Sequence, residues 1–134
     1  MMTAKPIPNA VKQTTPTNCF RACVATLLNL PIDDVPECCD GKSWDWDAFQ
    51  DWLGDRGLQA VEVTFGSGGT IYPVRKAVPC IVTGKSPRDE NTLHATVGHF
   101  FSFEGFQLLH DPHPEKLWID GEPTHATFFV RLEI

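Results

Sequence analysis

The sequence contains no long hydrophobic run. No stretch approaches the roughly 20 apolar residues of a membrane-spanning helix, and residues 1–13 carry Lys5 and Lys12 but no apolar segment of signal-peptide length. These absences predict a cytoplasmic protein without a membrane partner. The sequence also lacks an excess of positive charge, since 11 basic residues stand against 17 acidic ones for a net charge of −6. That balance repels phosphate backbones, so no nucleic-acid partner is expected.

A disulfide framework, internal repeats and low-complexity tracts are missing as well. The cysteines number five, which is odd, and Cys38 and Cys39 are neighbours poorly placed to bridge each other, so we expect free thiols. A chain of 134 residues with 42% hydrophobic residues can bury a core without such cross-links. The sequence therefore predicts one domain over residues 1–134.

The first half of the chain is patterned for helices. Apolar residues recur with helical spacing at Phe20, Cys23, Val24, Leu27 and Leu28. Thr17 or Asn18 can cap the start of this helix, and Pro31 requires it to end by Leu30. The sequence thus predicts a short helix with one buried face.

A second helix is predicted from a cap at Ser43 through residues 44–53, with a stop at Gly54 or Gly57. Beyond Gly57 the apolar residues alternate or form short runs, which indicates strands. The predicted strands span residues 61–65, 80–82, 93–103, 106–110 and 127–132, with a tight turn at Glu104 and Gly105. Helices followed by antiparallel strands predict an α+β fold with the helices packed to one side of the sheet.

Cys19 is the candidate nucleophile. It lies in the first turn of the first predicted helix, where unpaired N–H groups and the positive dipole end favour an anion, so its thiolate should form readily. Cys23, one turn later on the apolar stripe, is expected to be a small core residue. Gln13 precedes Cys19 by six residues. That is far enough for the chain to loop back and aim a side-chain amide at an oxygen under attack by the sulfur.

His94 and Asp111 are the candidate base and its partner. His94 opens the long predicted strand, and Asp111 follows the strand that returns after the Glu104–Gly105 turn. Antiparallel pairing brings the start of one strand near the end of the other, so the two side chains should be neighbours. A carboxylate beside a histidine fixes its tautomer and raises its basicity, which a thiol nucleophile requires.

These residues resemble the papain-like cysteine peptidase superfamily, and most closely its small branch related to bacteriocin-processing, double-glycine-leader peptidases. The resemblance rests on four patches: Gln13, residues 18–23, residues 94–98 and residues 110–114. It implies a papain-like fold whose central helix starts at the nucleophile. It also implies a role for each residue: Cys19 as nucleophile, His94 as general base and acid, Asp111 as the group orienting His94, and Gln13 with the Cys19 N–H as oxyanion hole.

The implied activity is that of a cysteine peptidase or amidase that cleaves an amide bond of a peptide or protein through an acyl-enzyme. An acyl transferase, a deamidase and a non-catalytic peptide-binding module on the same fold are the alternatives. The leader peptidases have Gly directly after the nucleophile where this chain has Phe20, so their double-glycine specificity is not carried over. Asn18, Phe20 and Trp44 are the candidate substrate contacts.

Metal binding is the competing use of the histidines. His94, His99, His110, His113 and Asp111 are possible ligands, with Cys38 and Cys39 as the other plausible ones. The spacing does not favour a chelate, because His94 and His99 are five apart and point to opposite faces of a strand. We therefore expect neither a metal nor another cofactor.

Overall fold

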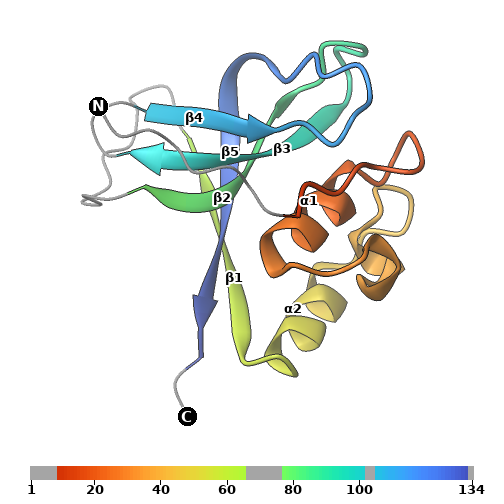
Figure 1. The fold of residues 1–134 in the computed structure, drawn as a ribbon, viewed down its shortest axis with the longest axis vertical. Helices are drawn as coiled ribbons and strands as arrows, with labels where there is room; N and C mark the ends of the chain where they lie inside the picture. The colour runs from red at the N-terminus through yellow and green to blue at the C-terminus, as the bar shows by residue number, and fades with distance from the viewer. Residues whose placement is uncertain (1–8, 66–76, 102–104, 133–134) are drawn as a thin grey trace.

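The computed structural model describes residues 9–65, 77–101 and 105–132, and in it two helices lie on one face of a five-stranded antiparallel sheet (Figure 1). The helices are α1 (Cys19–Leu28) and α2 (Trp46–Gly54), with two short 3-10 turns, η1 (Ile32–Asp34) and η2 (Glu37–Cys39), between them. The strands are β1 (Leu58–Thr64), β2 (Val78–Lys85), β3 (Leu93–Phe101), β4 (Gly105–His110) and β5 (Asp120–Arg131). The predicted α+β class is thus confirmed.

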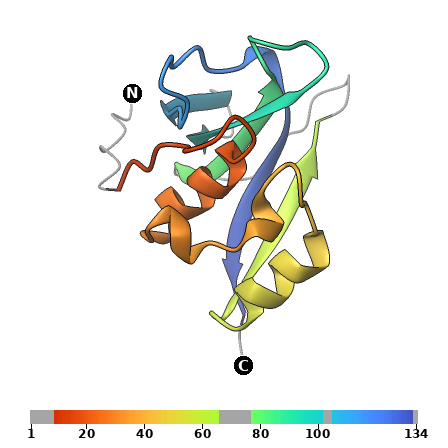
Figure 2. The same ribbon diagram turned by 90° about the vertical axis from the view of Figure 1, so that its right-hand side faces the viewer.

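The strands are ordered β1-β5-β2-β3-β4, so the last strand of the chain inserts between the first two. In Figure 2 the helices stand in front of the sheet, with α1 toward β3 and α2 toward the β1–β5 end. The predicted pairing of the long strand with its return is confirmed, because β3 and β4 are antiparallel, with Val97 opposite His110. Glu104, the first residue of the predicted turn, lies outside the described residues.

α1 follows the prediction from its apolar stripe. It ends at Leu28, where Asn29 adopts a left-handed conformation (φ 58°) and its N–H bonds the carbonyls of Ala25 and Thr26. The predicted end by Leu30 is therefore confirmed. Asn18 occupies the N-cap position, but its side chain makes no bond to the helix. The expected side-chain cap is wrong on this point, because the Asn18 amide is engaged on the preceding segment instead.

α2 begins later than predicted. Its N-cap is Asp45, whose carboxylate accepts the backbone N–H of Ala48 at 3.1 Å. The predicted start at Ser43 is wrong, and Trp44 lies before the helix. The helix ends at Gly54, one of the two predicted stops.

Three strands are longer or shifted relative to their predictions. β1 starts at Leu58 instead of residue 61, β2 extends on both sides of residues 80–82, and β5 starts at Asp120 instead of residue 127. β5 is paired with β1 on one side and with β2 on the other, so backbone hydrogen bonds hold it where its side chains are polar and exposed. A strand of this kind cannot be predicted from alternating hydrophobic residues, because its side chains are polar. The last two residues of the predicted strand 93–103 lie outside the described residues.

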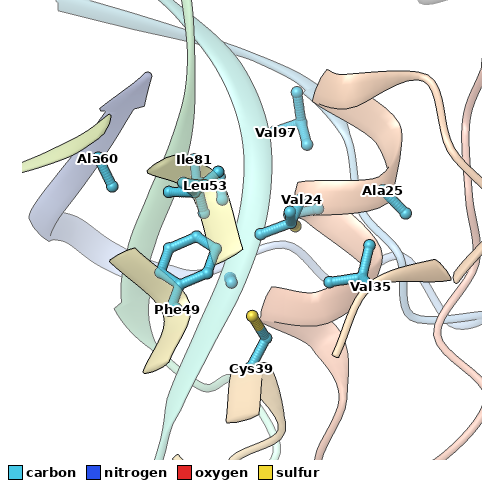
Figure 3. Close-up of a cluster of buried hydrophobic side chains, with 11 residues drawn as sticks. Val24, Ala25, Val35, Cys39, Phe49, Leu53, Ala60, Ile81 and Val97 are labelled. Atoms are coloured by element: carbon cyan, nitrogen blue, oxygen red, sulfur yellow. The ribbon is translucent and has the colours of Figure 1, made fainter. Parts of the chain in front are cut away.

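The core fills the space between the helices and the sheet (Figure 3). Its labelled members are all nearly or fully buried: Val24, Ala25, Val35, Cys39, Phe49, Leu53, Ala60, Ile81 and Val97. Phe49 is central, since its ring meets Phe20 of α1 at 5.7 Å and Phe129 of β5 at 6.3 Å, both edge to face. This packing joins α2, which carries Phe49, to α1 and to β5. No helix in the described ranges is long and apolar enough to cross a membrane.

Candidate active site

Cys19 starts α1 with its half-buried sulfur facing the first residues of β3. Burial raises the pKa of this thiol, but other effects outweigh burial and bring the pKa below its ordinary value. They are a hydrogen bond from the His94 side chain, one from the Ala95 N–H, the charge of His94 and a bond from the Phe20 N–H. The positive end of α1 favours the same ionised form. His94, two backbone N–H groups and the end of the helix therefore all favour the thiolate.

His94 lies on β3 and is 3% exposed. Its Nε2 is 2.6 Å from Oδ1 of Asp111, which leaves Nδ1 as the nitrogen available to Cys19. Burial alone lowers the pKa of the imidazole, yet the bonds to Asp111 and Cys19 and their charges raise it to about 9. At neutral pH the imidazole is therefore protonated beside the Asp111 carboxylate, and its charge favours the thiolate form of Cys19.

Asp111 directly follows β4 and is 1% exposed. Besides His94, two backbone N–H groups bond its carboxylate: His113 to Oδ1 at 3.0 Å and Trp118 to Oδ2 at 2.8 Å. Burial raises the pKa of this carboxyl, but these three donors and the charge of His94 lower it overall. The segment after β4 is shaped to surround the carboxylate, since Lys116 and Trp118 both adopt positive φ (52° and 64°).

Gln13 is tied to the same loop through its backbone N–H, which donates to the carbonyl of Pro112 at 2.9 Å. Its side chain lines the cleft beside Cys19, with Nε2 donating to the carbonyl of Thr15 at 2.9 Å. An amide nitrogen has two N–H groups, so one remains for a ligand. The N–H of Cys19 belongs to the first turn of α1 and has no acceptor within the helix. These two donors are the candidate oxyanion hole.

Asn18 is fully buried and does not line the cleft. Its Oδ1 accepts the backbone N–H groups of Thr14 and Thr15 at 3.0 and 3.1 Å, and its Nδ2 donates to the Thr14 hydroxyl at 2.8 Å. The expectation of a substrate contact is therefore not met, because Asn18 is buried and its amide oxygen and nitrogen both bond the segment between Gln13 and the helix.

His110 has a comparable structural use that sequence reasoning left without a role. It is 7% exposed, and its Nε2 lies 2.6 Å from the carbonyl of Val11, 99 residues earlier in the chain. This bond fixes the segment that carries Gln13 against the end of β4. The signal was present in the sequence as a second histidine next to Asp111.

The site opens into a cleft of about 830 Å³. One wall is aromatic, with Phe20 and Trp44 in edge contact at 4.9 Å and Trp46 beside them. The loop between β2 and β3 also lines the cleft, through Ser86, Arg88, Asp89 and Thr92, and so do Glu62 and His125, whose side chains lie 3.2 Å apart. Two of the three candidate substrate contacts, Phe20 and Trp44, thus line the cleft.

The remaining candidate ligands do not converge. In the described part of the chain no group of three His, Cys, Asp or Glu side chains is arranged to hold a metal ion. His99 pairs with Gln107 toward the far end of β3, and Cys39 is buried in the core.

No protein-family model and no curated protein matches this chain.

Proposed function

We propose that the chain is a papain-like cysteine hydrolase that cleaves an amide bond of a peptide or protein with Cys19, His94 and Asp111 as its triad. One observation carries the proposal. Three residues far apart in sequence come together at the cleft: the His94 imidazole is 2.6 Å from the Asp111 carboxylate, it acts on the ionisation of the Cys19 thiol, and both His94 and Asp111 are almost completely buried. A buried charged series of this kind is costly unless its members stabilise one another, which is the arrangement of an activated nucleophile.

The mechanism follows from the positions of these groups. The Cys19 thiolate attacks the carbonyl carbon, and the oxygen that becomes negative accepts N–H groups of Cys19 and Gln13. His94 gives its proton to the leaving amine as the carbon–nitrogen bond breaks, which leaves a thioester on Cys19. A water molecule then attacks the thioester with His94 as base. The carbon–sulfur bond breaks and the acid is released, which leaves the Cys19 thiolate beside a protonated His94, as at the start.

The surroundings of the site suit a peptide substrate, and the free cysteines suit a reducing compartment. The aromatic wall of Phe20, Trp44 and Trp46 offers an apolar surface beside the nucleophile. The five cysteines are free thiols, and free thiols persist where disulfides are kept reduced. We therefore propose a cytoplasmic enzyme with a peptide or protein substrate.

Alkylation kinetics test the activated thiol. At pH 6, iodoacetamide should label Cys19 much faster than any other cysteine of the protein, as located by peptide mass spectrometry, because only Cys19 combines a lowered pKa with access from the cleft. Cys19→Ala should remove this fast phase, whereas Cys38→Ala should keep it. Equal labelling of all five cysteines would falsify the activated thiolate.

Turnover is tested separately. A peptide library incubated with wild-type protein should yield new termini, and a vinyl-sulfone peptide should modify Cys19 alone. Cys19→Ala should show neither. The masses of the products distinguish hydrolysis from transfer of the acyl group to an amine. A reactive Cys19 that turns over no amide in the library would leave the non-catalytic module as the better description.

A further inference from the structure

We propose that Arg88 forms a carboxylate-binding subsite in the cleft, so that the enzyme acts on peptides with a carboxylate close to the bond that is cut. The inference rests on the proposed function and names the substrate class of the same site. The carboxylate belongs either to the free C-terminus of the peptide or to an Asp or Glu side chain. It would pair with the Arg88 guanidinium next to His113.

Arg88 lies on the loop between β2 and β3, six residues before His94, and lines the same cleft as Cys19. Its backbone N–H donates to the Ser86 hydroxyl at 3.2 Å, which fixes the loop locally. Its Nη1 is buried, yet it has no hydrogen-bond partner among the described residues. A buried guanidinium nitrogen is rarely left in this state, because loss of hydration without a partner is unfavourable.

Other unsatisfied atoms belong to residues that line the same cleft. Within the described ranges, the buried polar atoms without a partner include Gln13 Oε1 and Thr83 Oγ1, and both of these residues line the cleft with Arg88. Arg88 is the one charged group of the three. The lining is therefore that of a site for a polar ligand, with the strongest preference for an anion at Arg88.

His113 locates this subsite relative to the chemistry. Burial lowers the pKa of its imidazole, and the nearby charge of Arg88 lowers the pKa further, so His113 lies within the field of the guanidinium. The His113 ring is 6.2 Å from the His94 ring, centre to centre. Extended peptide spans about 3.3–3.6 Å per residue. The two rings are thus less than two extended residues apart, so a carboxylate beside His113 lies close to the bond that Cys19 attacks.

The carboxylates already present do not occupy Arg88. Asp89 follows it but is exposed, and its Oδ1 accepts the N–H of Asn91 at 3.0 Å. Glu115 faces His113 instead, at 3.9 Å from Nε2. No ion pair joins Arg88 to either group in the described part of the chain. An incoming carboxylate would meet an unpaired, partly desolvated cation.

Calorimetric titration of the Cys19→Ala protein tests the subsite without any turnover. The first probe pair is N-acetyl-Phe-Gly as free acid and as C-terminal amide, and the second is N-acetyl-Phe-Asp-amide and N-acetyl-Phe-Asn-amide. We expect the acid member of at least one pair to bind about tenfold more tightly than its neutral partner. The pair that shows the difference identifies the source of the carboxylate.

Three further substitutions, each made in the Cys19→Ala protein, test whether the preference for the acid probe depends on Arg88. Arg88→Gln should bring the ratio to about one, and Arg88→Lys should leave an intermediate ratio, since it keeps the charge but loses the planar pair of donors. Lys42→Gln, a cation on the same cleft, should keep the full ratio. Thermal unfolding checks that each variant folds. If Arg88→Gln does not fold, the binding ratio of Arg88→Lys tests the inference instead.

Equal binding of acid and neutral probes in both pairs overturns the inference, and so does a preference that survives in both Arg88 variants. Failure to bind any of the four probes overturns it too. These outcomes are separate from those for the proposed function. A fast-labelling Cys19 with no acid preference removes only the carboxylate subsite, whereas an unreactive Cys19 with an Arg88-dependent preference removes only the hydrolase.

Discussion

Two cysteines lie at opposite ends of the interface between α1 and the sheet, and their pKa values shift in opposite directions. Cys23 lies in the apolar part and is 0% exposed, and burial, with the charges of Cys19 and Asp111, raises its pKa well above the ordinary value. Cys19, one turn earlier, is brought to a lowered pKa by His94 and two backbone N–H groups despite its own burial. Burial alone therefore suppresses a thiolate, and donors placed around the sulfur reverse the effect.

The other buried thiols follow the apolar pattern. Burial raises the pKa of Cys80 to about 12, and burial with the neighbouring Cys38 raises that of Cys39. Both side chains pack in hydrophobic clusters. The contrast with Cys19 is thus a matter of position and not of residue type. The variants that follow alter either the polar end or the apolar end of this interface.

Removal of His94 should give the largest effect. In His94→Gln the thiolate loses its imidazolium and the leaving group loses its acid, so kcat/KM should fall about 10⁴-fold. Fast iodoacetamide labelling of Cys19 at pH 6 should disappear as well. Amide hydrolysis and labelling rates measure the two losses.

His99→Gln is the matched control, because His99 lies on the same strand five residues later. It should keep the labelling rate of Cys19 within about twofold. If Cys19 were labelled at the same rate in the His94→Gln and His99→Gln variants, His94 would not be the group that activates the sulfur. The proposed difference between the two ends of the interface would then be wrong.

Asp111→Asn should have the next largest effect, about 10²–10³-fold in kcat/KM, because the orientation and charge of His94 depend on it. The wild-type profile should rise as pH increases through the lowered pKa of Cys19. It should fall as pH increases through about 9, where His94 loses its proton. Removal of the carboxylate lowers the pKa of His94, so the falling limb of kcat/KM against pH should move to lower pH.

Asp120→Asn is the control, since Asp120 is an exposed carboxylate paired only loosely with Lys85 at 3.7 Å. Its pH profile should superimpose on that of the wild type. A falling limb that stays near pH 9 in Asp111→Asn would show that another group holds the proton on His94.

The sequence was sufficient for the parts of this site that depend on regular elements. The apolar stripe defined α1 and so placed Cys19 at its start, and the β3–β4 pairing brought His94 to Asp111. Helical and strand periods are local, and a short antiparallel return has few alternative registers. That is why His94 and Asp111, 17 positions apart, could be placed together in advance, whereas the approach of Cys19 to His94 was expected from the family resemblance alone.

The parts that failed depend on contacts between irregular segments. The side chain of Asn18 holds the segment that carries Gln13, and His110 bonds the carbonyl of Val11. Neither bond follows a regular spacing of residues in the sequence. Each joins a side chain to a backbone group whose position is known only after folding. Arg88 was missed for the same reason, since a lone basic residue in a loop gives no sign of where its guanidinium lies.

Asn18→Ala should give a moderate effect that separates scaffold from chemistry. Two backbone N–H groups lose their acceptor, so the free energy of unfolding should fall by about 1–3 kcal/mol. Gln13 should lose its fixed position, and kcat should fall about tenfold, the smaller cost of one loosened oxyanion donor. Urea unfolding and steady-state kinetics measure the two. An Asn18→Ala protein of wild-type stability would show that the amide does not hold this segment.

Cys23→Ala should give the smallest effect and so tests the apolar end directly. The side chain packs among Val24, Phe49 and their neighbours, and removal of one sulfur should cost about 1 kcal/mol of unfolding free energy. Because Cys23 stays protonated, it contributes no charge to the site, and the labelling rate of Cys19 between pH 5 and 9 should match the wild type within about twofold. A shifted labelling profile would mean that Cys23 shares the ionisation of Cys19, in which case the two ends of the interface titrate as one unit.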